Sequence, residues 1–106
     1  MEARGITLEQ LAGALGCEVR LQNKNKYIRM NYTGYFRYGT YYNIIVYKKK
    51  DEFKVYVHVN IPKAPVQEMI VEQNGVKIVI EQMIEDAINR IIKNRINNEK
   101  DNIKHI

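Results

Sequence analysis

The sequence predicts an α+β fold, in which an antiparallel β-sheet of about four to six strands carries a short N-terminal helix and a longer C-terminal helix packed on one face. Apolar and polar residues alternate along the middle of the chain, whereas apolar residues recur at helical spacing towards both ends. The 106 residues, 45% of them hydrophobic, suit one domain with one modest core. We place this domain at residues 1–98 and expect residues 99–106 to form a disordered tail.

The first expected element is a helix over residues 8–15. Thr7 and Gln10 are spaced as a capping box, in which each side chain satisfies a backbone N–H group at the helix start. Gly16 is a suitable left-handed stop. A helix-turn-helix would need a second helix immediately afterwards, but residues 17–32 show strand-like alternation instead. This helix is therefore expected to belong to the α+β core.

A pair of strands is expected after this helix. Val19 and Leu21 alternate with charged residues, and Ile28 and Met30 resume the alternation after the turn-like stretch NKNK. Two short antiparallel strands joined by that turn are the predicted structure.

Two longer antiparallel strands are expected at the centre of the chain, joined by a charged turn. Residues 53–61 alternate almost without a break, and residues 40–52 supply the partner strand and the turn. If Lys48 pairs with Phe53, the apolar side chains of both strands gather on one face, whereas a slip of one residue would scatter them. The further pairs in this register are Val46 with Val55, Ile44 with Val57, and Tyr42 with Val59.

The same register divides the aromatic stretch of residues 31–47 between the two faces of the sheet. Phe36, Tyr38 and Tyr42 fall on the core face, where a buried tyrosine hydroxyl needs a hydrogen-bond partner. The opposite face is aromatic, basic and polar together, and the residues assigned to it are Tyr35, Arg37, Tyr41, Asn43, Ile45, Tyr47, Lys54, Tyr56 and His58.

Residues 66–80 fit two structures. Pro62 and Pro65 must end the preceding strand, since proline cannot donate to a ladder. Asn74-Gly75 between two apolar runs is typical of a tight hairpin, which we favour for this segment. A short helix that begins at Pro65 and is capped by Gly75 is the alternative.

The last expected element is a helix that lies across the apolar face of the sheet. Its apolar residues fall within one arc of a helical wheel: they are Ile80, Met83, Ile84, Ala87, Ile88 and Ile91. Ile92 and Ile96 lie beyond this arc, so they could form a homodimer contact or could simply mark a drift of the core at the helix end.

Positive charge is concentrated in the middle of the chain. The net charge is +5, and residues 23–63 hold nine basic and two acidic residues, whereas the segments on either side are each slightly negative. Such asymmetry is typical of a protein with an anionic partner, most often nucleic acid. A solvated basic edge that keeps strands from pairing with neighbours is the alternative.

The coincidence of tyrosines and cations predicts a small protein that binds nucleic acid, with single strands favoured. Unpaired bases stack on aromatic rings, and Lys and Arg neutralise phosphates. The expected contact residues are Tyr35, Arg37, Tyr41, Tyr47, Lys54, Tyr56 and His58 on the sheet, with Lys24, Lys26, Lys48, Lys49 and Lys50 in the turns. The alternative is a protein-interaction module, such as a small viral or mobile-element inhibitor or accessory factor, that uses the same Tyr and Arg face.

Enzymatic activity finds little support in the sequence. There is no serine, and the lone Cys17 follows the end of a helix, where the helix dipole disfavours a thiolate. His58 and His105 have no metal-ligating residue at a suitable spacing. We therefore expect no catalysis, metal or cofactor. The absence of a long apolar run and of disulfide pairs leads us to expect a soluble, cytoplasmic protein without membrane contact.

Overall fold

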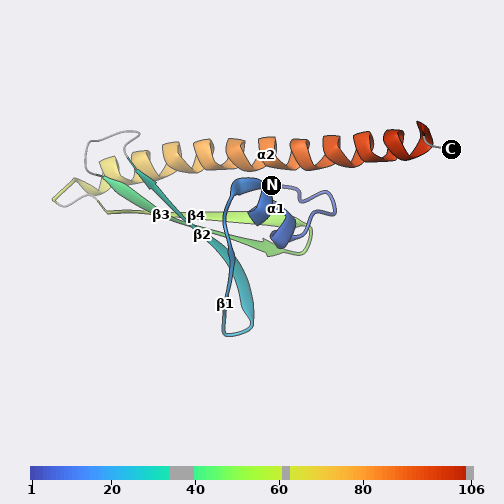
Figure 1. The fold of residues 1–106 in the computed structure, drawn as a ribbon. Coiled ribbons are helices and arrows are strands. Elements are labelled where there is room, and N and C mark those ends of the chain that lie inside the picture. The colour runs from blue at the N-terminus through green and yellow to red at the C-terminus, as the bar shows by residue number, and fades with distance from the viewer. Residues whose placement is uncertain (34–39, 61–62, 105–106) are drawn as a thin grey trace.

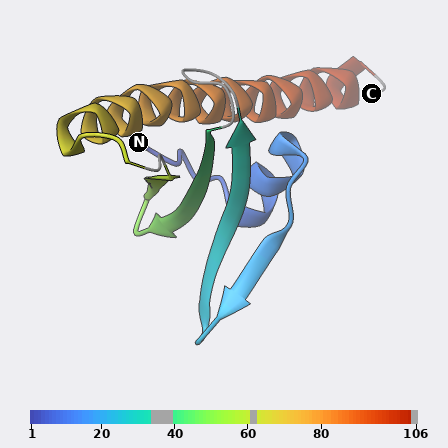
Figure 2. The ribbon, with the colours of Figure 1, turned by 90° about the vertical axis from the view of Figure 1, so that its left-hand side faces the viewer.

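The computed structural model describes residues 1–33, 40–60 and 63–104, with side chains described as far as residue 98. These residues form two layers, in which a four-stranded antiparallel sheet of order β1-β2-β3-β4 lies against a long helix (Figures 1 and 2). The elements are α1 (Leu8–Leu15), β1 (Val19–Gln22), β2 (Asn25–Thr33), β3 (Tyr41–Lys49), β4 (Glu52–Asn60) and α2 (Val66–Lys104). The predicted α+β fold class is confirmed.

Helix α1 has the boundaries and caps that its sequence predicts. The Gln10 N–H donates to Thr7 Oγ1 at 3.1 Å, and the Thr7 N–H donates to Gln10 Oε1 at 2.9 Å. Gly16 adopts a left-handed conformation with φ of 71°, which costs glycine little because it has no Cβ atom. Leu8 and Leu11 are buried, so α1 adds apolar side chains to the same core as the sheet.

The predicted register of β3 and β4 is confirmed from Lys48 opposite Phe53 to Tyr42 opposite Val59. The expected strand pair around the stretch NKNK is also present, as β1 and β2. The alternating apolar side chains of the strands gather on one face of the sheet, and this face packs against α2. Water is excluded between the two layers. The fully buried residues of this shared core include Tyr42, Ile44, Val46, Phe53 and Val59 of the sheet and Val76, Ile80, Ile84 and Ile88 of the helix.

Residues 66–80 are helical, so the favoured hairpin is wrong. Asn74 and Gly75 lie inside α2, and neither has the positive φ that a tight hairpin turn requires. The alternative helix was also too short, because α2 continues through Gly75 to Lys104. Val76 and Ile80 are both fully buried one helical turn apart, so the apolar stripe of the C-terminal helix extends back through this segment. This burial outweighs the local turn preference of Asn-Gly.

Tyr42 shows how the core accommodates a polar group. Its side chain is fully buried, and its hydroxyl donates to Glu72 Oε2 at 3.0 Å. Glu72 is itself buried on α2. The sequence predicted that a buried Tyr42 would need a partner, but Glu72 lies in the segment expected to form the hairpin.

The N-terminal residues pack beside the outer edge of β4. Ala3 N–H donates to the Asp51 carbonyl, and Phe53 N–H donates to the Met1 carbonyl, both at 2.8 Å. Arg4 then reaches α2, where it donates to Asn89 Oδ1 at 2.9 Å and pairs with Glu85. The first residues of the chain are thus joined to both layers.

Candidate nucleic-acid interface

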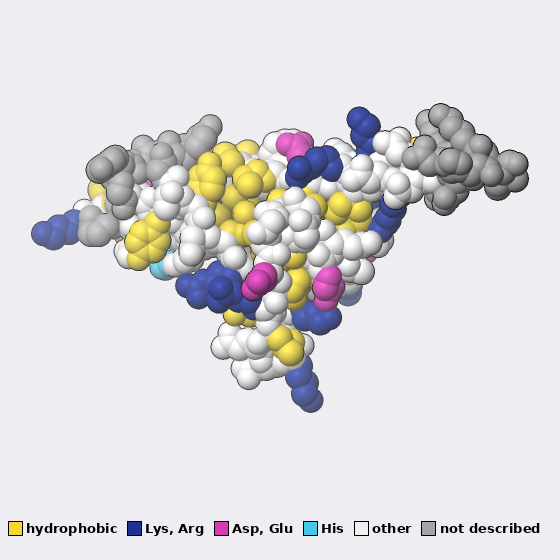
Figure 3. All heavy atoms as spheres, in the orientation of Figure 1, with side chains coloured by type: hydrophobic (Ala, Val, Ile, Leu, Met, Phe, Trp, Pro, Cys, Tyr) yellow, Lys and Arg dark blue, Asp and Glu magenta, His cyan; other side chains and the backbone are white. Residues whose placement is uncertain are grey.

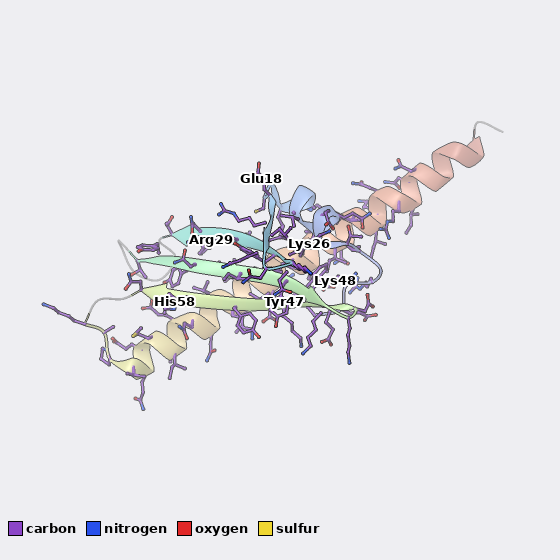
Figure 4. All side chains as sticks on the ribbon, turned by 90° about the horizontal axis from the view of Figure 1, so that it is seen from below. Glu18, Lys26, Arg29, Tyr47, Lys48 and His58 are labelled. Atoms are coloured by element: carbon purple, nitrogen blue, oxygen red, sulfur yellow. The ribbon has the colours of Figure 1, made fainter. Side chains whose placement is uncertain are left out.

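The face of the sheet that points away from α2, called the open face, carries the aromatic and basic side chains. Strand pairing assigns to it Arg20 of β1, Tyr27, Arg29 and Asn31 of β2, Tyr41, Asn43, Ile45 and Tyr47 of β3, and Lys54, Tyr56 and His58 of β4. Figure 4 views this face directly, with Arg29, Tyr47 and His58 on three neighbouring strands. The predicted division of β3 and β4 residues between the two faces is therefore correct for Tyr41, Tyr47, Lys54, Tyr56 and His58.

Tyr41, Tyr47 and Tyr56 place aromatic rings on the β3–β4 part of the open face. The rings of Tyr47 and Tyr56 are stacked, with centroids 5.5 Å apart and planes within 8° of parallel. Their hydroxyl oxygens are 3.1 Å apart, and this hydrogen bond raises the pKa of Tyr47 above its ordinary value. Tyr56 and Tyr41 remain 57% and 46% exposed, so ring surface is accessible from solvent. The rings are fixed to a sheet rather than carried on a loop.

The charged residues of β4 on the open face form an ion pair. Lys54 Nζ lies 2.9 Å from Glu52 Oε2 at the start of β4. This pair lowers the pKa of the Glu52 carboxyl and raises that of the Lys54 ammonium, mainly through their hydrogen bond. Both groups are solvent-exposed, so the pair contributes little to stability, and Lys54 stays available to a stronger anionic partner.

A hollow of about 980 Å³ opens beside the stacked tyrosines. It arises because β2 pairs with β3 only from Ile28 opposite Val46 onwards, whereas residues 25–27 turn away from β3 together with β1. Figure 1 shows this β1–β2 hairpin projecting from the sheet on the side away from α2. Tyr27 of β2 and Tyr47 of β3 both line it, together with Ile45 and Asn43 of β3. The volume lies within the range of small-molecule pockets.

The lining of the hollow is basic. Its lining includes the cations Lys24, Lys26, Arg29 and Lys48. Among the described residues that line it, the only carboxylate is that of Glu9. Lys26 Nζ lies 2.6 Å from Glu9 Oε1, and this hydrogen bond, followed by smaller effects that include the charge of Lys48, lowers the pKa of Glu9. Figure 4 shows Lys26 and Lys48 near the end of the sheet where Tyr47 lies. Glu9 is thus offset by Lys26, and the other three cations leave the hollow positive.

The predicted contact residues are only partly brought together. Tyr35 and Arg37 lie outside the described residues, as do Phe36 and Tyr38. The expectation that all five lysines lie in turns is wrong, because both turns contain only two residues. Lys24 and Lys50 occupy the turns, whereas Lys26, Lys48 and Lys49 are strand residues. Lys24, Lys26 and Lys48 line the hollow, while Lys49 and Lys50 are exposed near the β3–β4 turn.

Tyr27 and Arg29 belong to this surface but were not predicted as contacts. Ile28 and Met30 were correctly expected to be apolar strand positions. Tyr27 and Arg29 alternate with them, and this alternation alone places Tyr27 and Arg29 on the opposite face of β2. The contribution of Thr7, Leu8 and Glu9 to the hollow has no comparable signal, because it depends on where α1 packs against β2.

Other kinds of site find no support in the described part of the chain. No three His, Cys, Asp or Glu residues there are close enough to hold a metal ion. Within the same residues, no helix has an apolar stretch long enough to cross a membrane. No protein-family model matches the chain, and neither a curated protein nor a solved structure is detectably similar to it.

Proposed function

We propose that this protein binds nucleic acid, with a preference for single strands, through the open face of its sheet. The observation that carries the proposal is the stacked Tyr47–Tyr56 pair, held on a rigid sheet with the exposed ring of Tyr41 and the cations Arg29 and Lys54 on the same face. Aromatic rings and cations on one surface supply the two main terms of single-strand binding, base stacking and phosphate neutralisation.

The preference for single strands follows from the kind of contact. Bases in a duplex stack on each other and cannot lie on a protein ring, whereas bases of a single strand can be splayed onto one. The exposed rings of Tyr41 and Tyr56 belong to neighbouring strands of a sheet, as in other sheet surfaces that stack two or three bases. The asparagines Asn31 and Asn43 on the same face offer hydrogen bonds to base edges.

Charge on the surface supports the same proposal. Figure 3 shows Lys and Arg side chains along the lower side of the molecule and near the projecting hairpin, with acidic side chains among them and other Lys and Arg side chains along α2. These positions are on the side of the sheet opposite α2, where the open face lies (Figure 1). Electrostatic attraction would bring a phosphate backbone to this side first, and stacking would then favour unpaired bases.

The proposal is tested by fluorescence anisotropy of labelled single-stranded RNA, single-stranded DNA and duplex DNA at about 50 and about 200 mM salt. The wild type should bind a single strand more tightly than the duplex at both salt concentrations. Y56A should weaken single-strand binding about five- to hundredfold, which corresponds to one stacked base.

Y56F is the matched control, because it keeps the ring and removes only the hydroxyl that meets Tyr47. We expect Y56F to bind nearly as tightly as the wild type. Failure of the wild type to bind any of the three nucleic acids at the lower salt concentration would refute the proposed function. Equal binding by Y56A and Y56F would show that the ring of Tyr56 does not contact the nucleic acid, and the proposed binding surface would then be wrong.

Exposed apolar residues on the first half of α2 favour a second candidate function, binding of a protein partner. The exposed fractions of Val66, Val71 and Ile78 are 72%, 69% and 69%, and that of Ile70 is 50%. Figure 3 shows apolar side chains at the surface over this part of the helix. Val71 and Ile78 are seven residues apart and so lie on one face of α2, and exposed apolar surface on one face is typical of a protein contact. This surface is on α2, in the layer opposite the sheet. The sequence analysis instead placed a protein partner on the Tyr and Arg face of the sheet.

The second candidate is tested by affinity capture with the wild type and with V71Q/I78Q, followed by mass spectrometry. Both positions are exposed on a helix, so the variant should remain folded. A protein retained by the wild type and lost by the variant would support this candidate. Equal capture by the two would exclude this part of α2 as the contact. The homodimer contact through Ile92 and Ile96 stays a prediction; Ile92 packs partly against the core and Ile96 is 47% exposed.

A further inference from the structure

We propose that the hollow between the β1–β2 hairpin and β3 binds one nucleotide, with its base against tyrosine and its phosphate on the surrounding cations. This inference rests on the proposed function and extends it, because it assigns a defined nucleotide site next to the more open stacking surface of Tyr41 and Tyr56. The observation behind it is the separation of β2 from β3 beyond Ile28 and Val46, which leaves the hollow between them.

The shape of the hollow suits a planar ring. Its volume of about 980 Å³ accommodates a nucleotide together with bound water. Tyr27 and Tyr47 line it from two different strands, and Ile45 lines it from β3. A base that enters can contact an aromatic ring on its flat side and an apolar side chain at its edge.

The charge of the hollow suits a phosphate group. Lys24 approaches from the hairpin turn, Arg29 from β2 and Lys48 from the end of β3. Glu9 also lines the hollow, but its carboxylate accepts a hydrogen bond from Lys26. Three cations from three positions therefore surround one space, where a dianionic phosphate can form charge-assisted hydrogen bonds.

The polar lining distinguishes a nucleotide from a simple anion. Gln22, Asn25 and Asn43 line the same space, and each side-chain amide can donate and accept hydrogen bonds, as the edges of bases require. A site for inorganic phosphate alone would not need the aromatic walls. The combination of rings, amides and cations therefore points to a nucleoside monophosphate as the bound unit.

The test is a titration of the full ¹⁵N-labelled chain with uridine 5′-monophosphate, uridine and inorganic phosphate, followed by two-dimensional NMR. Uridine 5′-monophosphate should shift the amide signals of residues 24–29 and 43–48. Uridine and inorganic phosphate should each bind at least about tenfold more weakly, since each lacks half of the contacts.

K48A should weaken binding of uridine 5′-monophosphate about tenfold, which is the loss expected for one charge-assisted hydrogen bond. K93A is the matched control, because Lys93 is exposed on α2 and does not line the hollow. Equal losses in K48A and K93A would show a general charge effect and overturn the site. Equal affinities for inorganic phosphate and the nucleotide would also overturn it.

The two proposals fail in different ways. If oligonucleotides bind and depend on Tyr56 but the mononucleotide leaves residues 24–29 and 43–48 unshifted, the hollow is not a nucleotide site and the proposed function stands. If the mononucleotide binds in the hollow but oligonucleotides do not bind, the hollow stands as a nucleotide site and the proposed function falls.

Discussion

At the scale of single residues, the turns of this protein hold cations where glycine or asparagine would be easier to accommodate. Five described residues other than glycine have positive φ, namely Arg4, Asn23, Lys24, Lys50 and Lys63. Four of these are basic. A left-handed conformation costs an ordinary residue roughly 1 kcal/mol or more, so these positions give up some stability. Strain of this kind is often found where a side chain has a function.

Lys24 allows this interpretation to be tested directly. Its φ is 67°, and it follows Asn23 in the two-residue turn between β1 and β2. K24G creates the Asn-Gly pair that such a turn prefers, so we expect it to stabilise the protein by about 0.5–1 kcal/mol in urea unfolding. Because K24G also removes a cation from the hollow, it should weaken oligonucleotide binding at the same time. Increased stability with unchanged binding would show that Lys24 does not contact the ligand.

The hydroxyl groups of Tyr42 and Tyr56 should differ in their effect on stability. Y42F removes a buried hydrogen bond to the Glu72 carboxylate, so it should lower the free energy of unfolding by about 1–3 kcal/mol. Y56F removes a hydroxyl contact at the exposed surface and should change stability by less than about 0.5 kcal/mol. Urea unfolding of both variants measures the difference. Equal effects would contradict the assignment of the two faces.

At the scale of elements, the sequence predicts what depends on alternation and misses what depends on packing. The register of β3 and β4 follows from apolar residues at every second position, because only one register brings them together. Residues 66–80 were predicted incorrectly because Asn74-Gly75 is a strong local turn signal. The burial of Val76 and Ile80 against the sheet is a tertiary effect that a local signal does not contain.

The candidate site shows the same limit. The parity of β3 and β4 was sufficient to place Tyr41, Tyr47 and Tyr56 on one face. The hollow depends instead on the point where β2 separates from β3 and on the position of α1 beside it. Neither is encoded in a short pattern of residues, so Glu9 could not be predicted to lie near Lys48.

The ion pair between Glu9 and Lys26 links α1 to β2 and makes a pH-dependent contribution to stability. The pair lowers the pKa of Glu9 in the folded protein, so its stabilising effect is present above the pKa of an ordinary Glu, about 4.3, and disappears as the pH falls through the lowered value. K26M should therefore be less stable than the wild type near neutral pH, with a difference that narrows in acid. Urea unfolding across this pH range provides the measurement. A difference independent of pH would show that Lys26 acts through its aliphatic chain.

At the scale of the whole molecule, the two faces of one sheet carry different kinds of side chain. The face under α2 carries the buried core, and the open face carries rings and cations. The N-terminal residues pair beside β4, and Arg4 contacts α2, so the edge of the sheet is fixed near the β3–β4 turn. The open face can therefore be altered with little effect on the core.

Salt dependence tests whether the basic side of the molecule contacts a phosphate backbone. Lys48, Lys49 and Lys50 lie together at the end of β3 and in its turn. Each lysine that neutralises a phosphate contributes about 0.7 to the slope of log K against log salt for a single strand. Changing all three to alanine should therefore lower the slope by up to about two and weaken binding most at low salt. The measurement is anisotropy over a series of salt concentrations.

The matched control for this prediction is K93A, which removes an exposed cation from α2 on the opposite layer. Lys93 lies on the layer away from the open face, so only its long-range effect should remain, and salt screens it beyond about 10 Å at moderate ionic strength. The control should keep the slope of the wild type. If the two variants lower the slope equally, net charge rather than phosphate contacts near the β3–β4 turn governs binding. If the triple variant keeps the full slope, the phosphate contacts lie elsewhere, and Arg29 and Lys54 become the next positions to change.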